Sequence, residues 1–177
     1  MIEYKKLNKE DVTLALFAGF ERRQVVTKCW RQEEDGWKIR EEPFVDDWNA
    51  ENYAFLVQCL RDTAENGGLV LGAMEDGRLI GFAAAAPGKI GSRGQYVDLA
   101  SLHVTAGRRG GGIGRQLFSR VGEWAREQGA EALYISAHSS VESQAFYRAM
   151  GCRLAQEVQS FHVQEEPFDV QMECPLA

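Results

Sequence analysis

The stretch that decides the fold reads Val104-Thr105-Ala106-Gly107-Arg108-Arg109-Gly110-Gly111-Gly112-Ile113-Gly114-Arg115. It lies between a predicted strand over residues 95–104 and an amphipathic helix that ends at Gly129. The apolar face of that helix is formed by Ile113, Leu117, Val121 and Trp124. Glycines at this junction permit positive φ angles and a close ligand approach, and the free N–H groups of the first helical turn carry the positive end of the helix dipole. The stretch therefore predicts a cradle for a pyrophosphate group.

The glycine-rich stretch also permits other interpretations. A flexible surface loop followed by an ordinary helix is the alternative, because a glycine cluster alone is a weak motif. A Walker A loop requires Gly-Lys-Ser or Gly-Lys-Thr, which the stretch lacks. A Rossmann G-x-G-x-x-G motif needs a third glycine where Arg115 stands. Neither nucleotide-binding motif is present.

The chain before this stretch alternates strands and helices. Residues 2–7 predict a strand, and Asn8 is expected to cap a helical stretch. Another helix is expected to begin at Asn49 or Asn52 and to end at glycines 67 and 68. Residues 19–48 show no clear pattern and receive no assignment.

A hairpin then precedes the stretch, and strands and a helix follow it. The apolar runs 69–75 and 78–86 are joined by Asp76-Gly77, which favours a two-residue turn. Further strands are predicted over residues 132–137, 153–163 and 168–174, and Ser139-Ser140-Val141-Glu142 resembles a capping box that opens a helix ending at Gly151. These elements predict an α/β architecture, a mixed sheet flanked by helices.

Length and composition limit the possible functions. The 177 residues, 45% of them apolar, suffice for one buried core, so we expect a single domain over residues 1–177. The longest apolar run, 80–87, is too short to span a membrane, and no signal-peptide pattern is present, which predicts a cytoplasmic protein without a membrane partner. The net charge of −6 argues against nucleic acid and favours a cationic substrate. Four scattered cysteines and three histidines indicate no metal site.

Two motifs together resemble a known family. Arg109-x-x-Gly112-x-Gly114 resembles the acetyl-coenzyme A signature of GNAT acetyltransferases, Arg/Gln-x-x-Gly-x-Gly/Ala, and Val104 stands where the family's fourth strand ends. Residues 140–152 resemble the family's second motif, in which a helix carries a tyrosine, here Tyr147, four residues before a glycine. The family commonly has asparagine at the position of Ser140 and phenylalanine at that of Cys152. The resemblance is strong over residues 69–152 and faint elsewhere.

The resemblance implies a fold and an activity. The fold is the GNAT-like acyl-CoA N-acyltransferase fold, a central, mostly antiparallel sheet of about seven strands flanked by helices, with the fourth and fifth strands splayed. The activity is an N-acetyltransferase that moves an acetyl group from acetyl-CoA to an amine of a small molecule or peptide by direct attack. A non-catalytic acyl-CoA-binding or regulatory module is the alternative. The family's tendency to dimerise also suggests a homodimer.

The resemblance further implies which residues bind acetyl-CoA. They belong to the end of the fourth strand, to the glycine-rich turn and to the helix of the second motif: Leu102, His103, Val104, Arg109, Gly110, Gly111, Gly112, Ile113, Gly114, Arg115, Ser140, Ser143 and Tyr147.

Acyl transfer to an amine requires a neutral nitrogen, stabilisation of charge on the thioester oxygen, and a proton for the leaving thiolate. We predict Tyr147 as the proton donor, because a phenol with an ordinary pKa of about 10 stays protonated at neutral pH and the family places a tyrosine hydroxyl beside the sulfur. The alternative is that Tyr147 only completes the apolar face of its helix. We predict Asp98 as the base, at a spacing similar to that of a glutamate in some histone-acetylating members. The alternatives for Asp98 are a solvent-facing strand residue and an ion-pair partner of the bound amine. His103 can equally be a packed histidine without a proton to move.

The acceptor amine is not identified by the sequence. An organic cation would suit a group of acidic and aromatic side chains, if these face the cleft: Trp37, Glu41, Glu42, Asp46, Asp47 and Trp48. The segment 165–169 can contribute in the same way. Solvated surface charges and a polar turn are the respective alternatives.

Overall fold

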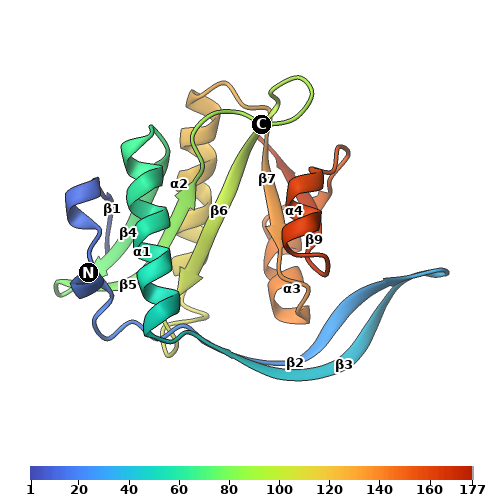
Figure 1. Cartoon of the computed structure of the whole chain (residues 1–177), viewed down its shortest axis with the longest axis horizontal. Coiled ribbons are helices and arrows are strands. Elements are labelled where there is room, and N and C mark those ends of the chain that lie inside the picture. The colour runs from blue at the N-terminus through green and yellow to red at the C-terminus, as the bar shows by residue number, and fades with distance from the viewer. Residues whose placement is uncertain (177) are drawn as a thin grey trace.

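The computed structural model describes residues 1–176 (Figure 1). Seven strands form one sheet in the order β1-β4-β5-β6-β7-β9-β8, and β2 and β3 form a separate two-stranded ribbon. The strands of the sheet are β1 (Glu3–Lys6), β4 (Leu69–Glu75), β5 (Arg78–Ala85), β6 (Tyr96–Val104), β7 (Ala132–Ala137), β8 (Arg153–Leu154) and β9 (Val170–Pro175). Of the described strand pairs in the sheet, β6–β7 alone is parallel. The predicted mixed, mostly antiparallel sheet is confirmed.

Helices cover both faces of this sheet (Figure 1). They are α1 (Ala50–Glu65), α2 (Ile113–Glu127), α3 (Val141–Ala149) and α4 (Ser160–Glu165), preceded by two short 3-10 helices, Lys9–Asp11 and Leu14–Phe17. The helical stretch predicted after Asn8 is therefore a single 3-10 turn. No helix among residues 1–176 is both long and apolar enough to cross a membrane.

The two larger apolar cores lie on the two faces of the sheet. One contains Leu71 and Ala83 and packs against α2, while the other contains Val70 and Phe82 and packs against α1. Neighbouring residues of one strand enter different cores because successive side chains point to opposite faces. Burial on both sides explains why β4 and β5 are apolar almost throughout.

The parallel strands β6 and β7 separate after a short pairing, as Figure 1 shows. They pair at Tyr96–Ala132, Val97–Leu133 and Asp98–Tyr134, whereas β6 continues to pair with β5 as far as Val104. A register shift in the β5–β6 pairing occurs at the same level, and such bulges bend a strand. Beyond Asp98 the edge of β6 that faces β7 therefore has no partner strand, and the predicted splay of the family's fourth and fifth strands is confirmed.

The residues left unassigned by sequence form the ribbon of β2 (Arg23–Glu33) and β3 (Gly36–Asp47), which extends away from the sheet (Figure 1). It is fastened midway, where the Trp30 amide donates to the Ser139 carbonyl over 2.8 Å and the Arg148 guanidinium lies 5.4 Å from the Trp30 ring. Val26 and Cys29 are the buried apolar residues of β2, and β3 has none. A ribbon with so little burial lacks the alternating pattern by which strands are recognised.

Two local predictions were wrong. The strand predicted over residues 153–163 is the two-residue β8 followed by a loop and α4. Side chains hold that loop in place of a strand ladder, because the Gln156 amide donates to Glu173 over 2.9 Å and the Gln159 amide donates to the Tyr134 hydroxyl over 3.0 Å. The capping box ending at Glu142 is also absent.

Instead, Ser140 is the N-cap of α3, and its hydroxyl accepts a hydrogen bond from the Ser143 amide over 3.2 Å. The predicted stop at Gly151 is confirmed by its φ of 95°.

Candidate active site

A cleft of about 1150 Å³ opens where β6 and β7 part. Most of the residues predicted to bind the coenzyme line it: Leu102, His103, Val104, Arg109, Gly110, Gly112, Ile113, Gly114, Arg115, Ser143 and Tyr147. Gly111, Ser140 and Asp98 are not among the lining residues. The two halves of the prediction, the turn before α2 and the start of α3, are thus brought to one cavity.

The turn before α2 is open toward the cleft. Gly110 and Gly112 have φ angles of 82° and 85°, and a Cβ atom built on either meets nothing within 4 Å. Gly112 is the N-cap of α2 and offers no side chain to cap it. Among residues 1–176, no hydrogen-bond acceptor is in reach of the amides of Ile113, Gly114 and Arg115. These free donors at a helix start suit a phosphate, so the turn fits the pyrophosphate of acetyl-CoA.

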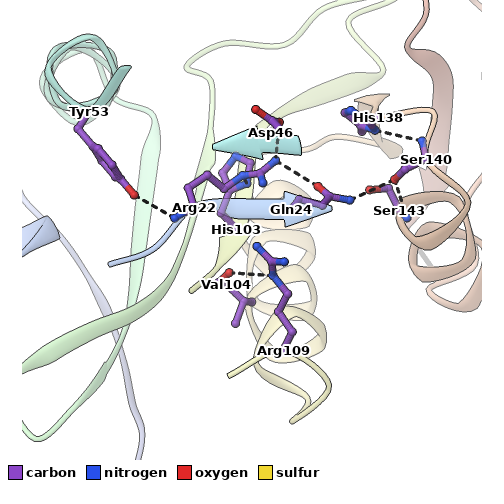
Figure 2. Close-up of polar contacts among 10 residues, drawn as sticks. All are labelled: Arg22, Gln24, Asp46, Tyr53, His103, Val104, Arg109, His138, Ser140 and Ser143. Atoms are coloured by element: carbon purple, nitrogen blue, oxygen red, sulfur yellow. Dashed lines mark hydrogen bonds and ion pairs between the residues drawn. The ribbon is translucent and has the colours of Figure 1, made fainter. Parts of the chain in front are cut away.

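Positive charge and close packing complete the turn. The Arg109 Nε donates to the Val104 carbonyl over 3.4 Å, and Figure 2 shows its side chain rising from the turn toward His103. Arg108 makes two hydrogen bonds with the Glu75 carboxylate, at 2.6 and 2.9 Å, and thereby ties the turn to β4. A Cβ atom on Gly114 would lie 3.4 Å from the Phe146 ring of α3, which is ordinary contact. The start of α2 thus packs closely on α3.

A buried arginine that the sequence analysis missed joins the ribbon to β6 (Figure 2). Arg22 is 7% exposed. Its Nε donates to His103 Nδ1 over 3.0 Å, and its Nη2 donates to Asp46 Oδ2 over 3.2 Å. The Tyr53 hydroxyl accepts from its amide over 3.0 Å. No signal in the sequence pointed to Arg22, because its partners come from α1, β3 and β6 and meet only in the folded chain.

Burial and this arginine together set the protonation state of His103. Burial, together with the charges of Arg22 and Arg109, lowers the pKa of His103 to about 3. The neutral ring accepts at Nδ1 and therefore carries its proton on Nε2. Its ring packs 4.9 Å from Trp48 and 5.4 Å from Phe82. His103 is a packed, neutral histidine, and it cannot serve as a base near neutral pH.

The predicted base, Asp98, lies beside the cleft and not in its wall. The residue is 8% exposed, and its Oδ2 is 2.9 Å from Nε2 of His162 in α4. Its Oδ1 is buried without a hydrogen-bond partner among the described residues. The hydrogen bond that His162 donates to Asp98 raises the pKa of His162. A solvent-facing Asp98, one of the alternatives, is wrong, and its function as the base stays a prediction.

Tyr147 lines the cleft from α3. Its ring packs 5.2 Å from Phe146 and 6.3 Å from Phe118, so it also completes the apolar face of its helix. Burial, with smaller contributions from Cys152 and Asp169, raises its pKa. The hydroxyl therefore remains protonated at neutral pH, as a proton donor must.

Ser140, by contrast, is completely buried under the ribbon. Its hydroxyl accepts hydrogen bonds from the Gln24 amide nitrogen, Nε2, over 3.3 Å and from the Ser143 amide (Figure 2). The predicted contact of Ser140 with the coenzyme does not fit this position, because the side chain caps α3 and fastens β2. Ser143, one turn further along α3, does reach the cleft.

Carboxylates and aromatic rings make up another part of the wall: Phe44, Asp46, Trp48, Glu142, Glu166 and Asp169. Among the acidic and aromatic candidates of β3, Asp46 and Trp48 reach the cleft, whereas Trp37, Glu41, Glu42 and Asp47 are absent from its lining. Asp169 accepts a hydrogen bond from the Ser136 hydroxyl over 2.9 Å. Burial raises its pKa to about 6.

Comparisons with known proteins agree with this geometry. The sequence profile described as Acetyltransferase (GNAT) family matches residues 33–152. No curated protein sequence matches significantly. A nourseothricin acetyltransferase has 18% identity and a TM-score of 0.71, and the alignment covers 99% of both chains. A Bacillus anthracis str. Ames protein assigned as a streptothricin acetyltransferase, solved with acetyl coenzyme A, has 13% identity and a TM-score of 0.73 over 100% of this chain and 99% of that one.

A further structure of the same fold also contains the coenzyme. The PaiA N-acetyltransferase of Thermoplasma acidophilum, solved with coenzyme A, has 16% identity and a TM-score of 0.61 over 99% of both chains. At these identities the structures share the fold, while the profile match spans more than half of the sequence, including both the turn before α2 and the helix α3. The chain therefore belongs to the GNAT family of acetyltransferases.

Proposed function

We propose that this protein transfers the acetyl group of acetyl-CoA to an amine of a small molecule or peptide by direct attack. The observation that carries the proposal is the arrangement of one cleft. Free amides and three arginines, Arg108, Arg109 and Arg115, lie around the turn before α2, while β3, α3 and the segment before β9 supply carboxylates. A phosphate-bearing donor and a cationic acceptor would thus meet at the parting of β6 and β7.

The donor would be held by backbone groups. The amides from Ile113 to Arg115 would bind the pyrophosphate. The unpaired edge of β6 at Leu102 to Val104 would form main-chain hydrogen bonds with the pantetheine arm, as it would with an adjacent strand. The bound coenzyme supplies a thioester, whose carbonyl carbon reacts with the amine. Main-chain groups would thus supply the affinity for the donor, and the cleft's side chains would be free to act on the acceptor.

Tyr147 would provide the proton for the leaving thiolate. Its raised pKa keeps the hydroxyl protonated, and its position on α3 directs it into the same cleft as the turn before α2. A general acid of this kind typically raises the rate of the catalysed step by about 100- to 10,000-fold.

The acceptor would be an organic cation with an apolar part that can pack against aromatic rings. Asp46, Glu142, Glu166 and Asp169 supply negative charge, and Phe44 and Trp48 supply rings over which an organic cation can lie. Nourseothricin and streptothricin, named in two proteins of the same fold, belong in the test panel with polyamines, aminoglycosides, amino acids and peptides with free N-termini or lysines.

The test is release of free thiol from acetyl-CoA with each amine of the panel. We expect at least one cationic amine to give turnover, and Tyr147→Phe to lower kcat by about 100-fold while acetyl-CoA still binds. Tyr4→Phe is the matched control, because Tyr4 lies on β1 against Arg120, outside the cleft. Tight acetyl-CoA binding without thiol release for any amine would favour the non-catalytic module instead. No binding of acetyl-CoA would overturn both hypotheses.

A further inference from the structure

We propose that Asp169 is the catalytic base that takes the proton from the acceptor's ammonium group, an assignment that rests on the proposed acetyl transfer. Asp169 directly precedes β9 and lines the cleft together with Ile135 and Ser136 of β7. Because β7 leaves β6 after the Asp98–Tyr134 pair, this carboxylate borders the gap in which the thioester would lie.

A chain of hydrogen bonds fixes the orientation of the Asp169 carboxylate. The Ser136 hydroxyl donates to Asp169 Oδ2 over 2.9 Å, and its oxygen accepts from Gln171 Nε2 over 3.0 Å. The Tyr134 hydroxyl in turn donates to the side-chain oxygen of Gln171. Since Gln171 fills the acceptor side of Ser136, the single hydroxyl proton is directed at Asp169. The second oxygen, Oδ1, makes no hydrogen bond with the described residues and remains free for a substrate proton.

The surrounding charges suit a base that works near neutral pH. Burial raises the pKa of Asp169 to about 6, the hydrogen bond from Ser136 and the charge of His162 oppose this shift, and Glu165 and Glu166 add to it. From α3, Tyr147 faces the carboxylate closely enough for its own pKa to be raised by it. At pH 7 the carboxylate is therefore ionised, yet more basic than an ordinary aspartate, while the phenol is protonated. A base and an acid with pKa values on opposite sides of neutrality share one cleft.

The other carboxylates near the cleft are less suited to this function. Asp98 is buried against His162 and does not line the cleft. Asp46 is paired with Arg22 at 3.2 Å. Glu142 and Glu166 are exposed to solvent. Asp169 combines contact with the cleft, partial burial and a neutral hydrogen-bond donor.

The proton balance of the reaction then closes. Asp169 takes one proton from R–NH3+ and becomes a carboxylic acid, and the neutral nitrogen forms a bond to the thioester carbon. The C–S bond breaks with its electron pair on sulfur. Tyr147 gives the thiolate a proton and recovers the proton that the new amide nitrogen releases. The products are the acetamide, the free thiol and the proton on Asp169, which passes to solvent through the open cleft.

The test is the pH dependence of kcat/KM of the full chain with the best amine of the panel. In the wild type, kcat/KM should fall as the pH drops below about 6, because protonated Asp169 cannot accept a proton. This fall is the acidic limb of the pH profile. Asp169→Asn should remove this limb and lower kcat at pH 7 by about 100-fold, with the deficit shrinking at higher pH, where the acceptor amine deprotonates by itself. Asp169→Glu should restore part of the rate.

Controls separate a chemical role from a structural one. Glu10→Gln, the same loss of charge on an exposed residue outside the cleft wall, should keep kcat within about twofold, since surface charges are weakly coupled. Acetyl-CoA affinity of Asp169→Asn should be unchanged. Should that variant fail to fold, Ser136→Ala supplies the test, because loss of its hydrogen bond should move the acidic limb upward by about one pH unit.

Two outcomes would overturn the assignment. One is an Asp169→Asn variant that retains the limb and nearly full kcat, and the other is removal of the limb by Asp98→Asn, which would return the function of base to Asp98. Failure of the proposed acetyl transfer is a different result, namely a wild-type protein that releases no thiol at any pH.

Discussion

Replacing Gly112 by alanine should weaken acetyl-CoA binding out of proportion to its effect on folding. Gly112 is the N-cap of α2, with φ 85° and ψ 2°, in the left-handed region that side chains other than glycine avoid. A Cβ atom there meets nothing within 4 Å, so the expected strain comes from the backbone and not from a clash. This strain costs about 1–2 kcal/mol, which corresponds to a fall in Tm of roughly 2–8 °C for a domain of this size.

The effect on binding follows if the strained residue relaxes to negative φ. Rotation of the peptide would then turn the first α2 amide, that of Ile113, away from the cleft. One hydrogen bond to a charged phosphate contributes about 1.5–3 kcal/mol, so Kd for acetyl-CoA should rise about 10- to 100-fold. Thermal unfolding followed by circular dichroism gives the first quantity, and isothermal titration calorimetry gives the second.

Gly107→Ala is the matched control. Gly107 has a φ of 90° and equally open surroundings, but it does not line the cleft. Both variants should therefore lose a similar amount of stability, and Gly112→Ala alone should lose affinity. Equal affinities for acetyl-CoA in the two variants would refute the assignment of the pyrophosphate to the amides of this turn.

Three further predictions concern the same structure. His103 has a pKa of about 3 in the fold and about 6.5 in the unfolded chain, so the unfolded chain binds the additional proton between these values and the free energy of unfolding should fall as the pH drops from about 6.5 toward 3. Urea titrations at several pH values should show that this free energy depends less on pH in His103→Gln, and an unchanged dependence would contradict a buried neutral ring. Arg31→Ala removes the 2.7 Å hydrogen bond from Arg31 Nη1 to the Ser139 hydroxyl that helps to fasten the ribbon, so limited proteolysis should cleave β2 or β3 several-fold faster than in the wild type. Equal cleavage rates in the two proteins would show that the ribbon is held by other contacts. Gly114→Ala places a methyl group at ordinary contact distance from Phe146 and favours the helix by up to about 1 kcal/mol, so calorimetry should find acetyl-CoA affinity retained and Tm unchanged or higher. A loss of binding would mean that the coenzyme approaches this backbone more closely than a methyl group allows.

Regular elements of the fold were predictable wherever burial repeats along the chain. The hairpin of β4 and β5 followed from two apolar runs around Asp76-Gly77, and Asp76 indeed has the positive φ of 52° that such a turn requires. The helix α2 followed from apolar residues at helical spacing. Both patterns survive because the hairpin is buried on both faces, one in each core, and α2 buries a continuous face in one of them.

The ribbon and the segment after β8 lack such a repeating pattern of burial. Strands β2 and β3 contact mainly each other, and their side chains are largely exposed, so no hydrophobic period marks them. The sequence predicts a strand after Leu154, but side chains distant in sequence, Tyr134 and Glu173, hold this segment as a loop. Hydrogen bonds between residues far apart leave no local pattern.

What the sequence by itself determined is the glycine-rich turn, whose amides are free because α2 begins there, and the position of Tyr147 on the helix that packs beside it. Those features are local, since a helix start and a positive φ depend on adjacent residues. What only the tertiary structure decided is the remaining wall of the cleft, where His103 and Asp169 acquire their charge states among buried partners such as Arg22. These states depend on burial and on partners brought from four or more elements, and neither quantity exists before the chain folds.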